Sequence, residues 1–368
     1  MNRCYVLLAS LCFVCIVSCN SLKNEQKYFN GDIIQIEDTS VRYEIKAKET
    51  GLNDVTSGRI AVYDSLIFFQ DFRYPTYFIS VYNYLTGKHI GDFFDKGNGP
   101  DEFVDLSMIY HFFYDSEDMK ALLYSFSREN VIIWNITESI ASGMTLISQT
   151  NLPNKNVYGS DMFLSEDSIL IASVNISFGL SDNTVKSNKV YNTIDLKNNN
   201  EVVKNFSQFN KPILNDNKNP LSGKDFYVSF PYVHPDRKKI VSAMALIDQI
   251  NVIDFSDYTQ NGYRLKNGGS FRDLKMNGGD FTLYYRGLTA DDKYIYALYV
   301  GKPFNRETGI LQSDVVHVFD WEGNLVSKLD LDHKANQIYI DSKTKILVIK
   351  DEIQDVVYYY EMKDILKY

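Results

Sequence analysis

The side chains best suited to recognising a ligand are arginines, carboxylates and tyrosines that stand together in short aromatic phrases. In LYYRGL (Leu283–Leu288), Tyr285 and Arg286 are adjacent. An arginine can hold a carboxylate or a phosphate through two parallel hydrogen bonds, and an aromatic ring beside it offers a flat apolar surface. We therefore predict that Tyr285 and Arg286 contribute to a ligand site. A structural ion pair is the alternative interpretation of the arginine.

Further candidates combine the same residue types elsewhere in the chain. The other predicted ligand-binding residues are Asp71, Arg73 and Tyr77 in FFQDFRYPTYF, Arg128 in SREN, Tyr227 in FYVSFPYVH, and Lys302, Phe304 and Arg306 in GKPFNRE. Aromatic rings next to orienting polar groups suit sugars or peptides. Packing inside the fold is the alternative interpretation of each single aromatic residue.

The sequence carries no recognisable catalytic or metal-binding motif. Its five histidines are scattered and form neither HExxH nor another close pair of metal ligands. GxSxG is missing, and Asn215–Asp225 has Pro220 where a calcium loop needs glycine. GNGPDEF is not followed by Lys-Ser/Thr, so we interpret it as a structural turn. We therefore predict no catalytic residue, no metal and no cofactor.

The cysteines point to a lipid anchor. The sequence contains four of them, all within the first nineteen residues: Cys4, Cys12, Cys15 and Cys19. Arg3 precedes an apolar run, Tyr5–Val17, that is too short to cross a bilayer and is typical of a secretory signal peptide. Ser18 stands directly before Cys19, and this ending resembles the bacterial lipobox, in which the cysteine is acylated and becomes the new N-terminus.

These features predict three segments. We expect a lipoprotein signal peptide over residues 1–18, a lipid-anchored tether over residues 19–30 and a folded domain over residues 31–368. An ordinary signal peptide is the alternative. Acyl chains on Cys19 would hold the exported protein at a membrane, which we expect to be the outer membrane, facing either the periplasm or the cell surface. Because no cysteine follows Cys19, core packing alone must hold the fold together.

The composition favours an all-β fold and argues against one class of partner. The net charge of −9 is spread along the chain, whereas nucleic-acid binding needs clustered lysine and arginine. Aromatic residues make up 14% of the chain, and aromatic side chains suit the pleated, half-buried surfaces of strands.

A turn-and-strand phrase recurs six times. Its aspartates are Asp64, Asp115, Asp167, Asp236, Asp291 and Asp341, at intervals of 51, 52, 69, 55 and 50 residues. Aspartate favours such turns because its carboxylate can accept a hydrogen bond from the backbone two residues on. A second β-branched or aromatic run follows each phrase, as in VIIWNI and VHVFDW, usually with a further turn and strand. Four hairpin-joined strands at a period near this length predict a six-bladed β-propeller.

The two ends of the chain predict how the ring closes. The sixth copy ends at Tyr368 without a fourth strand, whereas spare β-sequence, Asp32–Glu49, precedes the first copy. We predict that this N-terminal segment supplies the missing strand of the last blade, which would pair two open sheet edges. Two stacked β-domains are the alternative architecture.

Three phrases carry a family resemblance. FFDKGNGPDEF (Phe93–Phe103), GLTADDKYIYALYVG (Gly287–Gly301) and HVFDWEGNLVSKLDLD (His317–Asp332) look like the TolB-like six-bladed β-propeller lipoproteins of Bacteroidetes. The resemblance in organisation covers nearly the whole mature chain. It implies a fold and a location, and it implies no particular activity.

The loops indicate which face of the ring holds a site. We name the four strands of each blade a to d from the central channel outward. The b–c connections of the third and fifth copies and several d–a connections are long, and these loops share one face. Function concentrates in elaborated loops on rigid scaffolds, so we predict a site at the b–c/d–a face and the channel mouth.

The resulting functional prediction is a monomeric, lipid-anchored binding module of the cell envelope. Its partner would be a protein or a glycan, and nucleic acid is not expected. The alternative is an enzyme in the channel, a lyase or hydrolase acting on a sugar or lactone. An apolar patch on the elaborated face would favour a protein partner.

Overall fold

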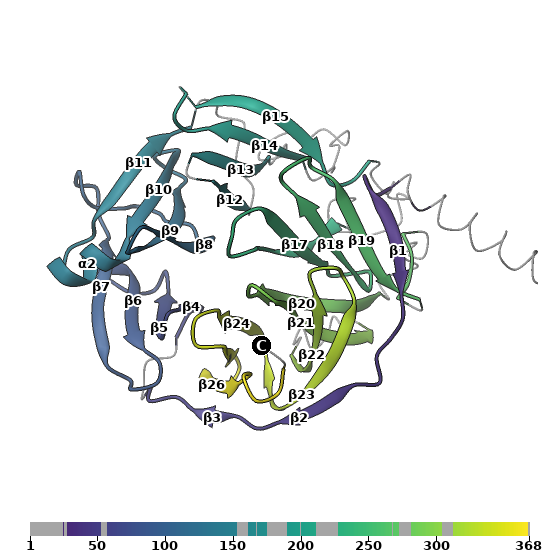
Figure 1. Cartoon of the computed structure of the whole chain (residues 1–368). Helices are drawn as coiled ribbons and strands as arrows, with labels where there is room; N and C mark the ends of the chain where they lie inside the picture. The colour runs from purple at the N-terminus through teal and green to yellow at the C-terminus, as the bar shows by residue number, and fades with distance from the viewer. Residues whose placement is uncertain are drawn as a thin grey trace, which may run out of the picture.

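The computed structural model describes residue 25 and residues 28–52, 57–152, 161–166, 168–174, 190–198, 200–210, 227–266, 268–271, 281–303 and 312–366. Within these residues six β-sheets stand around a central axis (Figure 1). The fold is a six-bladed β-propeller, which confirms the prediction from the sixfold repeat.

Each blade is an antiparallel sheet whose strands follow one another from the channel to the rim. Blades 1 to 3 consist of β4 (Arg59–Tyr63), β5 (Leu66–Gln70), β6 (Tyr77–Asn83) and β7 (His89–Asp95); β8 (His111–Asp115), β9 (Asp118–Ser125), β10 (Asn130–Asn135) and β11 (Ile147–Asn151); and β12 (Met162–Ser165), β13 (Ile169–Val174), β14 (Val190–Asp195) and β15 (Glu201–Ser207). A short helix, α2 (Ile136–Ser142), joins β10 to β11.

The other three blades contain additional strands from the N-terminal segment. Blades 4 to 6 consist of β16 (Ser229–Val233), β17 (Lys239–Met244), β18 (Gln249–Asp254) and β19 (Gln260–Leu265); β20 (Thr282–Ala290), β21 (Tyr294–Pro303), β22 (Ser313–Asp320) and β23 (Leu325–Ala335); and β24 (Gln337–Asp341), β25 (Ile346–Asp351) and β26 (Val356–Glu361). The sixth blade therefore has three strands of its own, as the sequence predicted.

The aspartate turns between strands a and b form as their chemistry predicts. Asp291 Oδ1 accepts a hydrogen bond from the backbone N–H of Lys293 at 2.8 Å. Asp236 and Asp341 accept the same bond from the residue two positions on, at 2.9 and 3.1 Å. These local bonds tighten the hairpins, because each carboxylate replaces a backbone acceptor in the turn.

The N-terminal segment forms a belt around the outside of half the ring (Figure 1). β1 (Asp32–Ile36) adds a fifth, parallel strand to β19 of blade 4, and β2 (Arg42–Ile45) does the same to β23 of blade 5. β3 (Lys48–Glu49) then pairs with β26 as the fourth strand of blade 6, which confirms the predicted closure. The two fifth strands were not predicted.

The belt begins further upstream than its first strand. Phe29 is fully buried, forms a β-bridge with Phe209 and packs its ring 6.2 Å from that ring. Glu25 is 4% exposed and accepts a hydrogen bond from the backbone N–H of Phe271 at 2.7 Å. Of the expected tether, the described residues therefore pack against the ring, and Cys19 and residues 1–24 lie outside the described residues.

Aromatic packing between blades holds the ring together. Trp134 of blade 2 is fully buried, and its ring lies 5.2 Å from those of Phe93 and Phe94 in blade 1. Burial of each such side chain contributes roughly 1.5–3 kcal/mol. Similar clusters fill the other interfaces between blades, so apolar burial provides the cohesion that a fold without disulfides requires.

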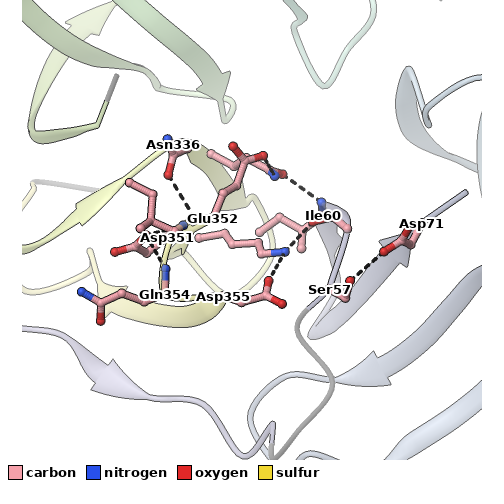
Figure 2. A network of polar contacts seen from close by, with 12 residues as sticks. Ser57, Ile60, Asp71, Asn336, Asp351, Glu352, Gln354 and Asp355 are labelled. Atoms are coloured by element: carbon pink, nitrogen blue, oxygen red, sulfur yellow. Dashed lines mark hydrogen bonds and ion pairs between the residues drawn. The ribbon is translucent and has the colours of Figure 1, made fainter. Parts of the chain in front are cut away.

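Blade 6 is joined to blade 1 through both apolar and polar contacts (Figure 2). Lys350, whose side chain is 2% exposed, forms an ion pair with Asp355 at 2.9 Å and donates a hydrogen bond to the carbonyl of Gly58. Gln337 Oε1 accepts a hydrogen bond from the backbone N–H of Ile60 at 2.9 Å. These contacts reinforce a closure in which β3 pairs with only two residues of β26.

Candidate binding face

The loops of blades 1 and 2 form a pocket on the b–c/d–a face. It has a volume of about 330 Å³ and is lined by Phe72, Phe78, Lys96, Gly97, Asn98, Phe103 and Val104. Phe72 belongs to the b–c loop of blade 1, whereas Lys96 to Val104 belong to the connection between blades 1 and 2. The pocket therefore lies at the junction of the two blades.

Large apolar side chains stand out from this junction into solvent. Phe72 is 64% exposed and Val104 is 63% exposed. Phe126, in the b–c loop of blade 2, is 50% exposed, and its backbone N–H donates to Asp105 Oδ1 at 2.7 Å, next to Val104. Exposed apolar groups that are contiguous and surrounded by polar residues mark interaction sites. We call Phe72, Val104 and Phe126, together with the pocket that Phe72 and Val104 line, the apolar patch.

The backbone beneath the apolar patch is held rigidly. Arg128 donates hydrogen bonds to the carbonyls of Gly99, Pro100 and Glu102, and its guanidinium lies 4.8 Å from the ring centre of Phe103. Glu102 Oε2 accepts a bond from the N–H of Gly99 at 2.8 Å. The GNGPDEF segment is therefore a structural turn, and the guanidinium of Arg128 supports this turn.

Lys96 fixes the other side of the pocket. Its Nζ donates to the carbonyl of Phe72 at 2.8 Å and to that of Tyr74, and it lies 4.7 Å from the ring centre of Phe78. Burial lowers the pKa of this ammonium. The contact ties the b–c loop of blade 1 to the following connection, so Phe72 is presented from a loop that is bonded in place.

Asp71 and Arg73 pair with each other. Arg73 Nη2 lies 2.6 Å from Asp71 Oδ2 and 2.6 Å from Ser57 Oγ. These hydrogen bonds hold the pKa of Asp71 well below its usual range. The Asp71 side chain is 7% exposed and that of Arg73 is 78% exposed. Figure 2 shows Asp71 and Ser57 beside the loop between β25 and β26 of blade 6. Tyr77 packs its ring 4.9 Å from that of Tyr74.

Tyr285 and Tyr227 lie inside the fold. Tyr285 is fully buried, and its hydroxyl donates to Asp248 Oδ1 of blade 4 at 2.5 Å. Tyr227 is 4% exposed and stacks on Phe209 with ring centres 4.1 Å apart. These two tyrosines therefore form part of the contact between elements, whereas Phe304 and Arg306 lie outside the described residues.

Tyr285 belongs to a buried titratable cluster that sequence reasoning missed. Burial raises the pKa of Asp248 to about 6 and lowers that of His317 to about 3. His317 stacks on Tyr299 with ring centres 3.8 Å apart. The cluster joins a blade 4 loop to three strands of blade 5, and no spacing in the sequence relates Asp248 to His317.

Arg286 and Lys302 lie in blade 5 on the same face. Lys302 is exposed near the end of β21, opposite Leu283 of β20. Arg286 is half-buried on β20, and its Nε is buried without a hydrogen-bond partner. Of the predicted site residues, the structure therefore brings Asp71 and Arg73 together, and it leaves Arg286 as an unpaired guanidinium within the described part of the chain.

The apolar patch was not anticipated as a site. Phe72 stands inside the phrase FFQDFRYPTYF, in which the predicted ligand-binding residues are the charged Asp71 and Arg73 and the aromatic Tyr77. Exposure of an apolar residue depends on which neighbouring loops cover it, and this cannot be read from a single phrase. The useful signal was the elaborated connection between blades 1 and 2, which the sequence placed on this face.

Two searches of the described residues give negative results. Across the ranges that the structure describes, histidine, cysteine, aspartate and glutamate form no group of three or more suited to hold a metal ion. None of the helices in those ranges is long and apolar enough to cross a membrane.

Comparisons with known proteins place the fold. A search of curated proteins gives no match. A member of the DUF4221 family from Bacteroides vulgatus is 12% identical, with a TM-score of 0.54 over 89% of this chain and 97% of its own. A protein from Bacteroides fragilis that is described as exported is also 12% identical, with a TM-score of 0.49 over 89% of this chain and 98% of its own. At such identities the first likeness shows a shared fold.

A family model covers most of the chain. It matches residues 56–343, from the start of blade 1 to the turn after β24 in blade 6. The matched region contains the strands from β4 to β24, the apolar patch and Arg286. The chain therefore belongs to the TolB-like 6-blade propeller-like family.

Proposed function

We propose that this protein is a lipid-anchored binding module of the cell envelope that holds a protein partner on the apolar patch. The observation that carries the proposal is the exposure of Phe72 and Val104, which line one pocket, together with that of Phe126, whose backbone bonds Asp105 next to Val104. The fold is compatible with such a role, because a propeller presents loops from a rigid ring.

The chemistry of the patch favours a protein over a glycan. Sugar sites combine aromatic faces with polar groups that are free to bond hydroxyls. Here Arg128 is bonded to carbonyls of the turn, and Asp105 accepts hydrogen bonds from the N–H groups of Phe126 and Ser127 at 2.7 and 2.8 Å. With these polar groups occupied, the exposed side chains of Phe72, Val104 and Phe126 offer apolar contact, which an apolar side chain of a protein partner can match.

The size of the pocket suits a small anchor. A volume of about 330 Å³ lies at the lower end of the range for ligand pockets, roughly 300–1,000 Å³. One or two apolar side chains from an exposed segment would fill it. We infer a partner that inserts such a segment, since a few buried anchors carry most of the energy of a protein interface.

The lipid anchor would hold the ring close to a membrane. Glu25 comes six positions after Cys19 in the sequence. Even fully extended, this stretch spans roughly 20 Å. Because Glu25 packs on blade 4, an acyl group on Cys19 would keep blade 4 near the bilayer, whereas blade 1 lies across the ring (Figure 1). The apolar patch would then remain accessible to a partner in the envelope.

The partner site is tested by photo-crosslinking in cells that express the full chain. A photoreactive phenylalanine analogue replaces Phe72, and in a matched strain it replaces Leu85, which is 40% exposed in the c–d turn on the opposite face. We expect one defined adduct from position 72 that disappears with Val104→Asp, and no such adduct from position 85. Equal adducts at both positions, or an adduct insensitive to Val104→Asp, would contradict the proposal. An adduct to a second copy of this chain would contradict the expectation of a separate partner.

The anchor is tested separately. Cells are fed a clickable palmitate analogue, and the chain is recovered from membrane and soluble fractions. We expect label and membrane association that are both lost with Cys19→Ala. Unlabelled, soluble wild-type protein would rule out the anchor and leave the apolar patch to be judged on its own test.

A further inference from the structure

Arg286 occupies an irregular position on the innermost strand of blade 5. In the pairing of β20 with β21, Tyr285 lies opposite Tyr299 and Gly287 lies opposite Leu298. Arg286 is therefore an extra residue, a β-bulge. Bulges change the direction of a side chain and are frequent beside functional sites.

The neighbours of Arg286 show which way this part of the strand faces. The hydroxyl of Tyr285 bonds Asp248 in blade 4. A Cβ added at Gly287 would lie 3.3 Å from Ile338 Cγ2 of β24, so Gly287 faces blade 6. Thr289, two residues further on, accepts a hydrogen bond on Oγ1 from the N–H of Ile340 in the same blade. Arg286 therefore lies level with the start of β24, near the b–c/d–a end of the channel.

The charge of Arg286 is unpaired. Its buried Nε–H donates to no partner within the described ranges, and no ion pair to this residue exists there. Arg264, in contrast, is 3% exposed and donates to both Gln249 and Glu25. A guanidinium stays charged at every physiological pH, and burying its N–H groups without an acceptor costs free energy. A position that retains such a group calls for an explanation.

A second unpaired arginine lies on the other side of β24. Arg59 is exposed at the start of β4, and it makes no ion pair in the part of the chain that the structure describes. Gln337 Oε1 accepts a hydrogen bond from the N–H of Ile60, so the start of β24 is level with Arg59. Arg59 and Arg286 thus flank the first residues of β24 from two neighbouring blades.

The carboxylates of this region already have partners. Glu352 Oε1 accepts a hydrogen bond from Gln337 Nε2 at 2.6 Å. Asp351 Oδ1 accepts bonds from Gln312 at 2.5 Å and from the N–H of Ile353 at 2.8 Å (Figure 2 shows the Asp351 and Glu352 loop). Asp355 pairs with Lys350. Each of these three acids therefore has a polar partner of its own, whereas Arg286 and Arg59 make no ion pair within the described residues.

We propose that the channel mouth between β20, β24 and β4 binds an oxyanion, a carboxylate or phosphate group of a small molecule, with Arg286 as its direct ligand. Arg59 adds positive potential from the far side of β24. The guanidinium fork matches either oxyanion through two parallel hydrogen bonds. This site is separate from the apolar patch and does not depend on it.

The proposal makes a specific statement about the free protein. Without an anion, Arg286 is a half-buried cation whose Nε is buried and lacks a hydrogen-bond partner within the described residues, so Arg286→Met, which keeps an apolar side chain, should unfold at the same temperature or a higher one. A structural arginine would behave in the opposite way, because loss of its bonds would lower the midpoint. A residue that serves binding often lowers the stability of the free protein, so its replacement raises the unfolding midpoint and abolishes binding.

The test is isothermal titration of the purified protein with inorganic phosphate and, separately, with citrate at constant ionic strength. We expect the wild type to bind one of them, Arg286→Met to bind it at least tenfold more weakly, and Arg59→Gln to bind it several-fold more weakly. Arg42→Gln, which lies on belt strand β2 and is paired with Asp330 of β23, serves as the control and should match the wild type. The two anions distinguish a phosphate from a carboxylate ligand.

Three results would overturn the proposal. The first is wild-type protein that binds neither anion at 10 mM, a concentration that would raise the unfolding midpoint by about 2 °C for millimolar affinity. The second is unchanged binding by Arg286→Met. The third is a midpoint for Arg286→Met well below that of the wild type in anion-free buffer, which would make the arginine structural.

Discussion

Arg264 and Glu25 form an ion pair at 3.0 Å although they are 239 positions apart in the sequence. Their side chains are 4% and 5% exposed, so both charges are removed from water. The pair fastens the start of the N-terminal belt to strand d of blade 4. It also lies close to Phe271, whose N–H donates to the same carboxylate.

Glu25→Gln should destabilise the protein substantially. The substitution leaves the guanidinium of Arg264 buried with weaker partners, and breaking a buried pair in this way costs roughly 3–5 kcal/mol. The double variant Glu25→Gln, Arg264→Met should recover part of the loss, because it removes the stranded charge. Urea unfolding of the wild type and the variants measures both effects. If Glu25→Gln is as stable as the wild type, the ion pair between Glu25 and Arg264 contributes little to the free energy of unfolding.

The exposed and buried phenylalanines of blade 1 should differ sharply in their effect on stability. Phe72 is 64% exposed, so Phe72→Ala should change the free energy of unfolding by less than about 0.5 kcal/mol. Phe103 lines the same pocket but is 2% exposed, so Phe103→Ala should cost roughly 3–5 kcal/mol. Thermal and urea unfolding check the contrast. A large loss for Phe72→Ala would mean that this side chain serves the fold and would weaken the case for a partner.

The sixfold repeat made the blades predictable from the sequence, whereas the two fifth strands that the belt adds, β1 and β2, were not predicted. Each aspartate turn is local, so Asp291 and Lys293 reveal a hairpin within a few residues. β1 and β2 pair with strands more than two hundred positions away. Their side chains are largely exposed, so β1 and β2 bury only isolated isoleucines and show little of the alternation that marks a strand.

The candidate sites differ in the same way. Arg286 could be named as a candidate from the sequence because an arginine beside tyrosines on a predicted innermost strand is a local pattern. That Arg286 lacks a hydrogen-bond partner within the described residues could not be predicted, because it depends on the acceptors that blades 4 and 6 bring nearby. The buried Asp248–Tyr285 contact depends likewise on two blades meeting, and the exposure of Val104 depends on the loops around it.

Asp248 should make the protein less stable as the pH rises. Burial raises its folded pKa to about 6, above the ordinary value of 3.8, although Tyr285, Tyr299 and Lys328 favour the ionised form or bond to it. Stability from the protonated carboxyl is complete below pH 3.8 and is lost as the pH rises through 6. Relative to the wild type, Asp248→Asn should therefore gain about 2 kcal/mol between pH 4 and pH 7.

Urea unfolding of both proteins at several pH values checks this prediction. Asparagine keeps an oxygen that accepts the hydroxyl of Tyr285, so the variant tests the charge with little change in packing. His317 lies in the same cluster and is present in both proteins, so its titration cancels to first order in the comparison. A difference between the two proteins that does not vary with pH would contradict a raised pKa for Asp248.

His111 should act in the opposite direction, by making the protein sensitive to acid. It is 4% exposed between blades 2 and 3, and neither ring nitrogen has a hydrogen-bond partner within the described residues. Burial lowers its pKa to about 3, from an ordinary 6.5, so the neutral ring stabilises the fold at neutral pH and this stability is lost as the pH falls from 6.5 toward 3.

Phenylalanine is a close replacement, because the ring of His111 already packs 5.6 Å from that of Phe113. His111→Phe removes two unsatisfied nitrogens and should raise stability at pH 7 by roughly 1–3 kcal/mol. It should also reduce the loss of stability between pH 7 and pH 4.5 by about 2–3 kcal/mol. The reason is that the variant has no ring at this position that takes up a proton on unfolding. Unfolding curves at the two pH values measure both changes. If the variant is less stable at pH 7 and loses as much as the wild type at pH 4.5, His111 is held by contacts that its burial and unbonded nitrogens do not account for.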